Sequence, residues 1–304
     1  MPRQTGSLNA AILLIVLLLI ALTACSPARP GSDHGLRAIT AIPTAPPSLT
    51  PISTPERDPT SNAGNGTPTP TGIRTPAYRS CSDAQIAQML RAIPAYAPGD
   101  GAFVQADESD LVIGGEPFTV QGVNLVPARE PWRGVFAEDL GAIGDNFERL
   151  NSVGVNTVRL IVPYASLFRC PGHGAVPQPD AVAHLDAVIR LARAFDLYVI
   201  VVLHHHADLI DHPLYTTTGD TLAQTAFIVN RYRAEPAILA WDVRDHGDQD
   251  YAIFGRDVVL NWLSRTVAAL RTLDANHLIT AGWSHHTEDT RDLVDVVSLQ
   301  HFGT

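Results

Sequence analysis

The sequence predicts an α/β domain of the (β/α)8 TIM-barrel type, incomplete, with about six strand–helix units. Apolar, β-branched runs recur at intervals of roughly forty residues, and helical segments separate them. The runs are continuous rather than alternating, which is typical of strands buried on both faces of a parallel sheet. After a first run that ends at Asn124, the predicted strands are Val155–Val162, Leu197–Leu203, Ala237–Val243, Leu278–Gly282 and Val294–Leu299.

The predicted domain begins with a helix. Ser82 and Gln85 have the spacing of an N-terminal capping box, and apolar residues follow at helical intervals in SDAQIAQMLRAI. Two strand-like runs then flank ADESD, and Gly114-Gly115 turns the chain into a third run that ends at Asn124. From there strands alternate with helical segments such as AVAHLDAVIRLARAFD and VVLNWLSRTVAALRTLD.

A barrel fits this pattern better than a doubly wound sheet. The segment GVNLVPARE lacks the G-x-G-x-x-G phosphate loop that follows the first strand of many doubly wound folds. Polar and aromatic residues instead follow strand after strand, as on the catalytic face of a (β/α)8 barrel, whereas a doubly wound sheet would gather them at one switch point. They are Asn124, Arg159 with Tyr164, His204 to His206, Asp245 with His246, Trp283 with His285 and His286, and Gln300 with His301.

Residues 1–25 predict export. Arg3 precedes the apolar run Ala10–Leu22, which is shorter than the ~20 residues of a transmembrane helix and has the size of a signal-peptide core. Leu22-Thr23-Ala24-Cys25 resembles the lipobox of bacterial lipoproteins. We therefore expect Cys25 to carry a lipid anchor, with the domain held at the membrane outside the cytoplasm. An ordinary secretory signal or an uncleaved anchor is the alternative.

The remaining organisation is a linker and one domain. Residues 26–79 are rich in Pro, Thr and Ser without apolar periodicity, which predicts a disordered linker, and the domain occupies residues 80–304. If Cys25 is acylated, Cys81 and Cys170 remain as a possible disulfide, the alternative being two unpaired thiols. The net charge of −10 and the lack of any Lys/Arg run argue against nucleic acid as a partner.

Six segments carry a family resemblance. In chain order GGEPFTVQGVNL, GVNTVRLIVPY, LYVIVVLHH, AILAWDVRDHGD, HLITAGW and VDVVSLQHF resemble the first six strands of the clan-A glycoside hydrolases, most closely family five, the cellulase and mannanase type. The resemblance covers roughly Phe103 to the end of the chain. It implies an O-glycosyl hydrolase that acts on β-linked polysaccharide or oligosaccharide by a retaining mechanism, without a cofactor.

The resemblance also implies a set of substrate-binding residues. The active-site arginine that ends the second strand is matched by Arg159 and the histidine that ends the third by His204. Trp283 matches the aromatic end of the fifth strand, and His301 lies in the cluster after the sixth. The whole predicted substrate-binding set is Asn124, Arg159, Tyr164, His204, His205, Asp245, Trp283 and His301. Trp132, in a loop after the first strand, is expected to stack on a sugar ring as well.

The sequence departs from the family pattern at the catalytic positions. In WDVRDHGD, Asp245 stands at the family's asparagine and His246 at its general acid/base glutamate. The sequence ends after the sixth strand, so we expect the strand that carries the nucleophile to be absent. Retaining hydrolysis needs two carboxyl groups about 5–5.5 Å apart. Asp242 and Asp248 are the nearby carboxyl groups that could stand in.

The expectation is therefore a degenerate hydrolase that is inactive as this chain alone. Two alternatives stay open: an active hydrolase completed by missing C-terminal sequence, and a tethered carbohydrate-binding protein without catalysis. An incomplete barrel would also leave its first and last strands as open edges, which predicts self-association.

A metal site is the last possibility. His204, His205 and His206, with Asp208, Asp211 and His212, contain the residue types of a zinc site. Adjacent histidines at a strand end point to alternate sides, so we expect no metal.

Overall fold

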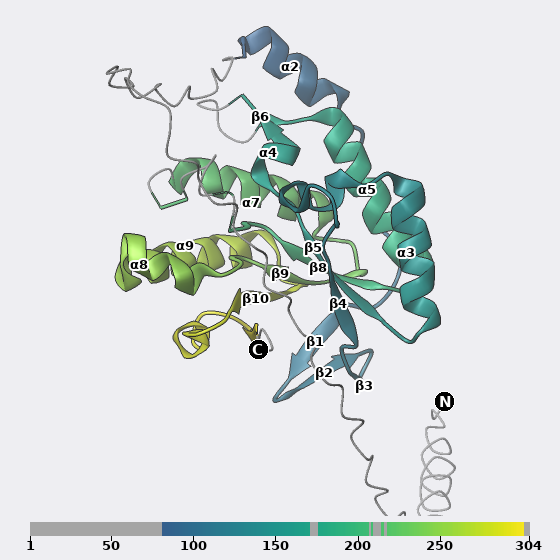
Figure 1. The fold of residues 1–304 in the computed structure, drawn as a ribbon, viewed down its shortest axis with the longest axis vertical. Helices are drawn as coiled ribbons and strands as arrows, with labels where there is room; N and C mark the ends of the chain where they lie inside the picture. Colours follow the sequence, from purple (N-terminus) through teal and green to yellow (C-terminus); the bar gives the residue numbers. More distant parts are fainter. Residues whose placement is uncertain (1–80, 171–175, 207, 209–213, 216–217, 301–304) are drawn as a thin grey trace, which may run out of the picture. The chain divides into compact units, whose positions relative to one another are not determined.

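The computed structural model describes residues 81–170, 176–206, 208, 214–215 and 218–300 (Figure 1). The predicted signal peptide with Cys25, the predicted linker and His301 lie outside the described residues. Residues 71–304 form one compact unit. In the described segments, no helix is both long and apolar enough to cross a membrane.

Six strands form one parallel sheet, in the order β11-β10-β9-β8-β5-β4, and every neighbouring pair is parallel. The strands are β4 (Gly122–Leu125), β5 (Thr157–Ile161), β8 (Tyr198–Val202), β9 (Ile238–Asp242), β10 (Leu278–Trp283) and β11 (Val296–Leu299). The sheet is curled and follows chain order from edge to edge. This is an α/β fold with the architecture of an incomplete TIM barrel, which confirms the prediction from the strand pattern.

Helices connect the strands along the outside of the curled sheet (Figure 1). Continuous burial of β9 and β10 agrees with strands covered on both faces. The helical elements are α2 (Asp83–Ala92), η1 (Pro131–Ala137), α3 (Leu140–Ser152), α4 (Tyr164–Leu167), α5 (Pro179–Ala194), α7 (Thr218–Tyr232), η2 (Gly247–Asp250), α8 (Tyr251–Phe254), α9 (Arg256–Leu273) and η3 (Thr287–Thr290).

The two faces of the sheet pack against different partners. On the outer face, Leu160, Val199 and Trp241 belong to the main core, which the helices complete. On the inner face, Leu239 and Ile200 belong to a smaller apolar cluster that also contains residues of a β-hairpin. This hairpin belongs to a three-stranded sheet of β1 (Val104–Asp107), β2 (Asp110–Ile113) and β3 (Glu116–Phe118). The hairpin therefore covers part of the inner face of the barrel.

The third run of the sequence, which ends at Asn124, is two strands rather than one. Its first part, β3, pairs antiparallel with β2, and its second part, β4, pairs parallel with β5. Asn156 holds the corner between them: its Nδ2 donates to the carbonyl of Thr119 at 2.8 Å, and its Oδ1 accepts the N–H of Gln121 at 2.8 Å. These two bonds come from a distant segment, so the local pattern could not predict the break.

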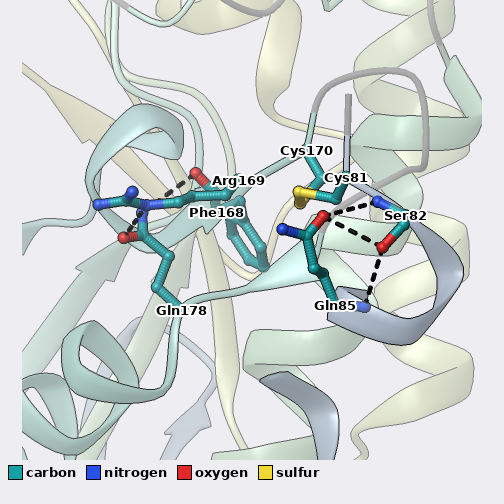
Figure 2. Close-up of a disulfide and its surroundings, with 7 residues drawn as sticks. All are labelled: Cys81, Ser82, Gln85, Phe168, Arg169, Cys170 and Gln178. Atoms are coloured by element: carbon teal, nitrogen blue, oxygen red, sulfur yellow. Dashed lines mark hydrogen bonds between the residues drawn. A yellow bond between two sulfur atoms is a disulfide. The ribbon is translucent and has the colours of Figure 1, made fainter. Parts of the chain in front are cut away.

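The first helix begins as the sequence predicts. Ser82 is the N-cap of α2, its side chain accepts the N–H of Gln85, and the Gln85 side chain accepts the N–H of Ser82. Cys81, directly before this cap, forms a disulfide with Cys170, 89 residues further along the chain (Figure 2). Cys170 follows β6 (Phe168–Arg169), which pairs with β7 (Val176–Pro177). The disulfide thus ties α2 to the loop after the second barrel strand.

Candidate functional site

Polar side chains from β4, β5 and β9 meet at the carboxyl ends of these strands, around Arg159 of β5. Its Nε and Nη2 donate to Asp242 Oδ2 of β9 at 2.9 and 2.6 Å. The same Nη2 donates to Asp245 Oδ1 at 2.7 Å, and Nη1 donates to Asn124 Oδ1 of β4 at 3.3 Å. The structure therefore brings together three of the predicted site residues, Asn124, Arg159 and Asp245.

Asp242 is the buried anchor of this group. Its carboxylate is 1 % exposed, and Oδ1 accepts the N–H of Gly282 in β10 at 3.1 Å. Burial raises the pKa of Asp242 and outweighs the opposing effect of Arg159. A side chain does not fit at Gly282, because its Cβ would lie 2.8 Å from Arg159 Nη2 and 2.9 Å from Asp242 Oδ2. Asp242 thus joins three strands and faces Arg159 rather than open solvent.

Asp245, in the loop after β9, is surrounded by donors. Besides Arg159, Gln300 Nε2 donates to its Oδ1 at 2.8 Å. The Nε2 atoms of His205 and His246 lie 3.4 and 3.8 Å from its two carboxylate oxygens. Burial alone would raise the pKa of Asp245, but the Arg159 charge and the Gln300 hydrogen bond more than offset it, and the pKa is lowered. Asp245 is therefore an ionised acceptor at neutral pH.

His205 and His246 face Asp245 from two loops. Burial lowers the pKa of His205 to about 4 despite the Asp245 carboxylate, so this imidazole is neutral near pH 7. His246 has a left-handed backbone with φ of 54°, and its N–H donates to the carbonyl of Gly282 at 2.9 Å. Its Nδ1 lies 3.3 Å from Gln249 Nε2, and its side chain is 18 % exposed. Both rings thus add nitrogen atoms to the rim of the Arg159 cluster.

His204 lies elsewhere, which corrects its assignment as the sugar-binding histidine of the third strand. It is fully buried, its Nε2 lies 3.0 Å from Thr225 Oγ1 of α7, and its ring packs edge-on against Trp262 of α9. The chain bends after β8, where the carboxylate of Asp208 accepts the N–H of His205 at 2.9 Å. His205 is consequently the histidine of this strand end that faces the cluster.

Two predicted aromatic contacts are also corrected. Trp283 is fully buried and packs edge-on against Tyr251, because side chains alternate along β10 and its neighbour Gly282 faces the cluster. Tyr164 is 5 % exposed and stacks on Phe168 in the main core. Neither ring presents a face to a ligand. The sequence pattern placed both residues beyond a strand end but could not predict on which face of the sheet their side chains lie.

Asp248, a candidate replacement for a catalytic carboxylate, accepts hydrogen bonds from the backbone of the turn after β10. Its Oδ2 accepts N–H bonds from Ser284 at 2.9 Å and from His286 at 3.3 Å, and a third from His285. Burial opposes ionisation, yet these bonds prevail and lower the pKa of Asp248. The carboxylate therefore fixes the turn after β10.

Gln300 is the residue that our predicted site left out. Its Nε2 donates both to Asp245 and to the carbonyl of Gly282, at 2.8 and 2.9 Å. The sequence feature that could have identified Gln300 is its position directly after the last predicted strand, next to His301. Among the described residues, no group of three or more His, Cys, Asp or Glu side chains is arranged to hold a metal ion.

The chain is similar to proteins of known class. The sequence profile of the cellulase family, glycosyl hydrolase family 5, matches residues 112–295. A mannan endo-1,4-beta-mannosidase F of Aspergillus fumigatus is 24 % identical over 215 residues, which cover 60 % of this chain and 47 % of that protein. The chain thus spans about half the length of this curated relative.

Solved structures show the same fold. A beta-1,4-D-mannanase from Cryptopygus antarcticus is 17 % identical with a TM-score of 0.50, over 60 % of this chain and 62 % of that one. An endo-1,4-beta-mannanase from Eisenia fetida is 16 % identical with a TM-score of 0.50, over 66 % of each chain. At such identities the likeness is one of fold, and it agrees with the parallel sheet described above. Because the family profile covers more than half of the sequence, this chain belongs to the cellulase family, glycosyl hydrolase family 5.

Proposed function

We propose that the domain binds β-linked polysaccharide at the Arg159 cluster and does not hydrolyse it on its own. The ligand class rests on family membership and on the name of the Aspergillus fumigatus relative, a mannan endo-1,4-beta-mannosidase. Mannan is therefore the first ligand to test, with β-glucan second. The choice of mannan over β-glucan as the natural ligand is part of this proposal.

The chemistry of the cluster supports a neutral, hydroxyl-rich ligand. Asn124 is exposed at the end of β4, and its amide offers both a donor and an acceptor. His205 and His246 add ring nitrogens, and Asp245 is an ionised acceptor held in place by Arg159 and Gln300. A small number of fixed polar groups at strand ends is the usual composition of a ligand site on this fold.

The carboxyl groups support the absence of catalysis. A general acid needs a protonated group whose pKa lies near the working pH. The carboxylate at the cluster, Asp245, has a lowered pKa, and so has Asp248, which is also held by three backbone N–H groups. Asp242 has a raised pKa but is buried against Arg159 and Gly282. The sequence observation that carries the proposal is His246 in WDVRDHGD: the resemblance to the family pattern puts this imidazole where the family has its acid/base glutamate.

Tethering at the outer side of the membrane is the second part of the proposal. It rests on the signal-like segment that ends at Cys25. The disulfide between Cys81 and Cys170 supports an oxidising compartment, because such bonds persist outside the cytosol and are rare within it. A lipid anchor would keep the polysaccharide ligand close to the cell surface.

The test is to measure binding and turnover separately on the compact unit of residues 71–304. We expect mannohexaose to bind in isothermal titration calorimetry and no reducing ends to be released from mannan, β-glucan or aryl β-glycosides. Asn124→Ala, an exposed change, should weaken binding about fivefold, as expected for one lost hydrogen bond. Turnover that disappears in His246→Ala would overturn the proposal and make His246 a general acid.

A further inference from the structure

A cavity elsewhere in the domain shares no lining residue with the Arg159 cluster. Its volume is about 520 Å³, and its walls come from η1, α4, β6 and the first turn of α5. Trp132 and Phe136 contribute the aromatic side, and Arg169, Gln178, Asp180 and His184 contribute the polar side. This size is within the range of roughly 300–1,000 Å³ found for small-molecule sites.

Trp132 is the notable residue of this cavity. It is 59 % exposed, whereas the other three tryptophans of the chain, Trp241, Trp262 and Trp283, are between 0 and 4 % exposed. A large indole left in water at the edge of a cavity contributes nothing to the core and offers a flat apolar face. The sequence pattern placed Trp132 in a loop after the first strand, and the Arg159 cluster makes no use of it.

The polar lining carries little net charge. Arg133 is paired with Glu130 at 3.1 Å, and the Arg169 Nε donates to Gln178 Oε1. The Asp208 carboxylate at the wall accepts N–H bonds from Tyr164 and His205, both at 2.9 Å. The cavity is lined by two arginines, Arg133 and Arg169, and two aspartates, Asp180 and Asp208, so its formal charges balance and it suits a neutral ligand better than an anion. A neutral ligand with one apolar face and a polar edge is a pyranose ring, whose C–H face fits an indole and whose hydroxyl groups fit amide and guanidinium donors.

The polar wall is also held rigid. Gln178 Nε2 donates to the carbonyls of Ser166 at 3.4 Å and Phe168 at 3.3 Å. Arg169 directly precedes Cys170, so the disulfide to Cys81 holds the end of β6 next to this wall residue (Figure 2). Groups that are already ordered cost less to engage than groups that must be ordered on binding.

We propose that this cavity is a second carbohydrate site, which takes one or two neutral pyranose units with Trp132 stacked on the ring. It is separate from the Arg159 cluster and does not depend on it. Asp208, which lines the cavity, accepts the N–H of His205 at 2.9 Å, so the cavity wall is bonded to the backbone of a residue that faces the cluster. Each site would hold its own hexasaccharide.

Trp132 itself provides the readout, because it is the exposed member of the four tryptophans. On residues 71–304, acrylamide quenching of tryptophan fluorescence should fall at least twofold when mannohexaose or cellohexaose saturates the site. Gln178→Ala should raise the hexasaccharide concentration needed for half of this protection about fivefold through loss of hydrogen bonding. Ile253→Ala, which removes another large exposed apolar side chain, is the matched control and should change nothing.

Calorimetry then separates this proposal from the proposed function. Wild type should bind two equivalents of a hexasaccharide. Trp132→Ala should lose the cavity and keep the cluster, and Asn124→Ala should weaken the cluster and keep Trp132 protection. Loss of protection in Asn124→Ala as strong as in Gln178→Ala would make Trp132 part of the cluster and overturn the second site. The second site would also be overturned if no neutral hexasaccharide protects Trp132 at about 20 mM. Protection by an acidic oligosaccharide alone would overturn it too.

Discussion

One nitrogen of Arg159, Nη2, bridges two carboxylates, with Asp245 Oδ1 at 2.7 Å and Asp242 Oδ2 at 2.6 Å. The two acids have different environments, although one cation serves both. Asp242 is sealed inside the strand ends and its pKa is raised, whereas Asp245 receives further donors and its pKa is lowered. The bridge therefore organises the face as a polar surface with a fixed ionised acceptor.

The first prediction concerns this bridge. Arg159→Met should lower the free energy of unfolding by about 3–5 kcal/mol, because it leaves two buried carboxylates without their cation. Chemical denaturation at pH 7 measures the change. Arg256→Met is the control, since Arg256 pairs with Asp289 with its own side chain 56 % exposed, and an ion pair exposed in this way contributes little to stability. Equal losses in the two variants would contradict the role of Arg159.

The second prediction concerns acid sensitivity through His205. Its folded pKa, about 4, lies below the unfolded value of 6.5, so the folded state favours the neutral ring. The resulting stability is fully present above pH 6.5 and is lost as the pH falls toward 4. The whole loss amounts to roughly 3 kcal/mol at most. Asp245, with its lowered pKa, adds a further loss below its unfolded pKa of 3.8.

His205→Gln should remove the first part of this dependence. We expect the unfolding free energy of the variant to fall less than that of the wild type between pH 6.5 and 4.5. Denaturant melts at several pH values measure it, with His285→Gln as a control because the His285 side chain is 77 % exposed. Parallel pH curves for wild type and His205→Gln would rule out His205 as the titrating group.

Sequence periodicity predicted the sheet well because strand burial is a property of each local run. It also placed Asn124, Arg159 and Asp245 on one face, since parallel strands end at the same edge. It failed where side-chain direction depends on distant contacts. His204 turns toward Thr225 and Trp262, and Trp283 faces outward because Gly282 takes the inner side. Such choices depend on tertiary packing.

The third prediction concerns the disulfide. Replacing both Cys81 and Cys170 by Ala should lower the free energy of unfolding by about 2–4 kcal/mol, because the bond closes a long loop in the unfolded chain. The melting temperature should fall by roughly 5–12 °C for a domain of this size. Dithiothreitol should lower the wild type to the same value and leave the double variant unchanged. A wild-type melting temperature that does not change with the reductant would contradict the prediction.

The fourth prediction concerns anchoring. Metabolic labelling of the full chain with a palmitate analogue in a bacterial host should mark the wild type and leave Cys25→Ala unmarked, because the acyl chains attach to that thiol. Cys25→Ala should also move from the membrane fraction to the soluble exported fraction. The control is Cys81→Ala, which should label like the wild type. Equal labelling of Cys25→Ala would remove the lipoprotein proposal.

The last prediction concerns the edges of the sheet. In the described part of the chain, β4 and β11 each have a neighbour on one side only. Val126, next to β4, is 50 % exposed, and Val297 and Leu299 of β11 are 46 and 63 % exposed. Exposed apolar edges without charges or prolines favour strand pairing between copies. We therefore expect residues 71–304 to associate, with a mass that rises with concentration in size-exclusion chromatography with light scattering.

A lysine on the edge should reverse this association. Val297→Lys places a charge on the outer strand and should shift the protein toward the monomer, because a charged edge disfavours pairing with a second copy. Val153→Lys, at a 77 % exposed position at the end of α3, carries the same charge away from any edge and should leave the mass of the wild type unchanged. If the wild type is instead a monomer that melts cooperatively above ~60 °C, the upper range for ordinary mesophilic domains, these edges are not association surfaces and the self-association proposal is wrong.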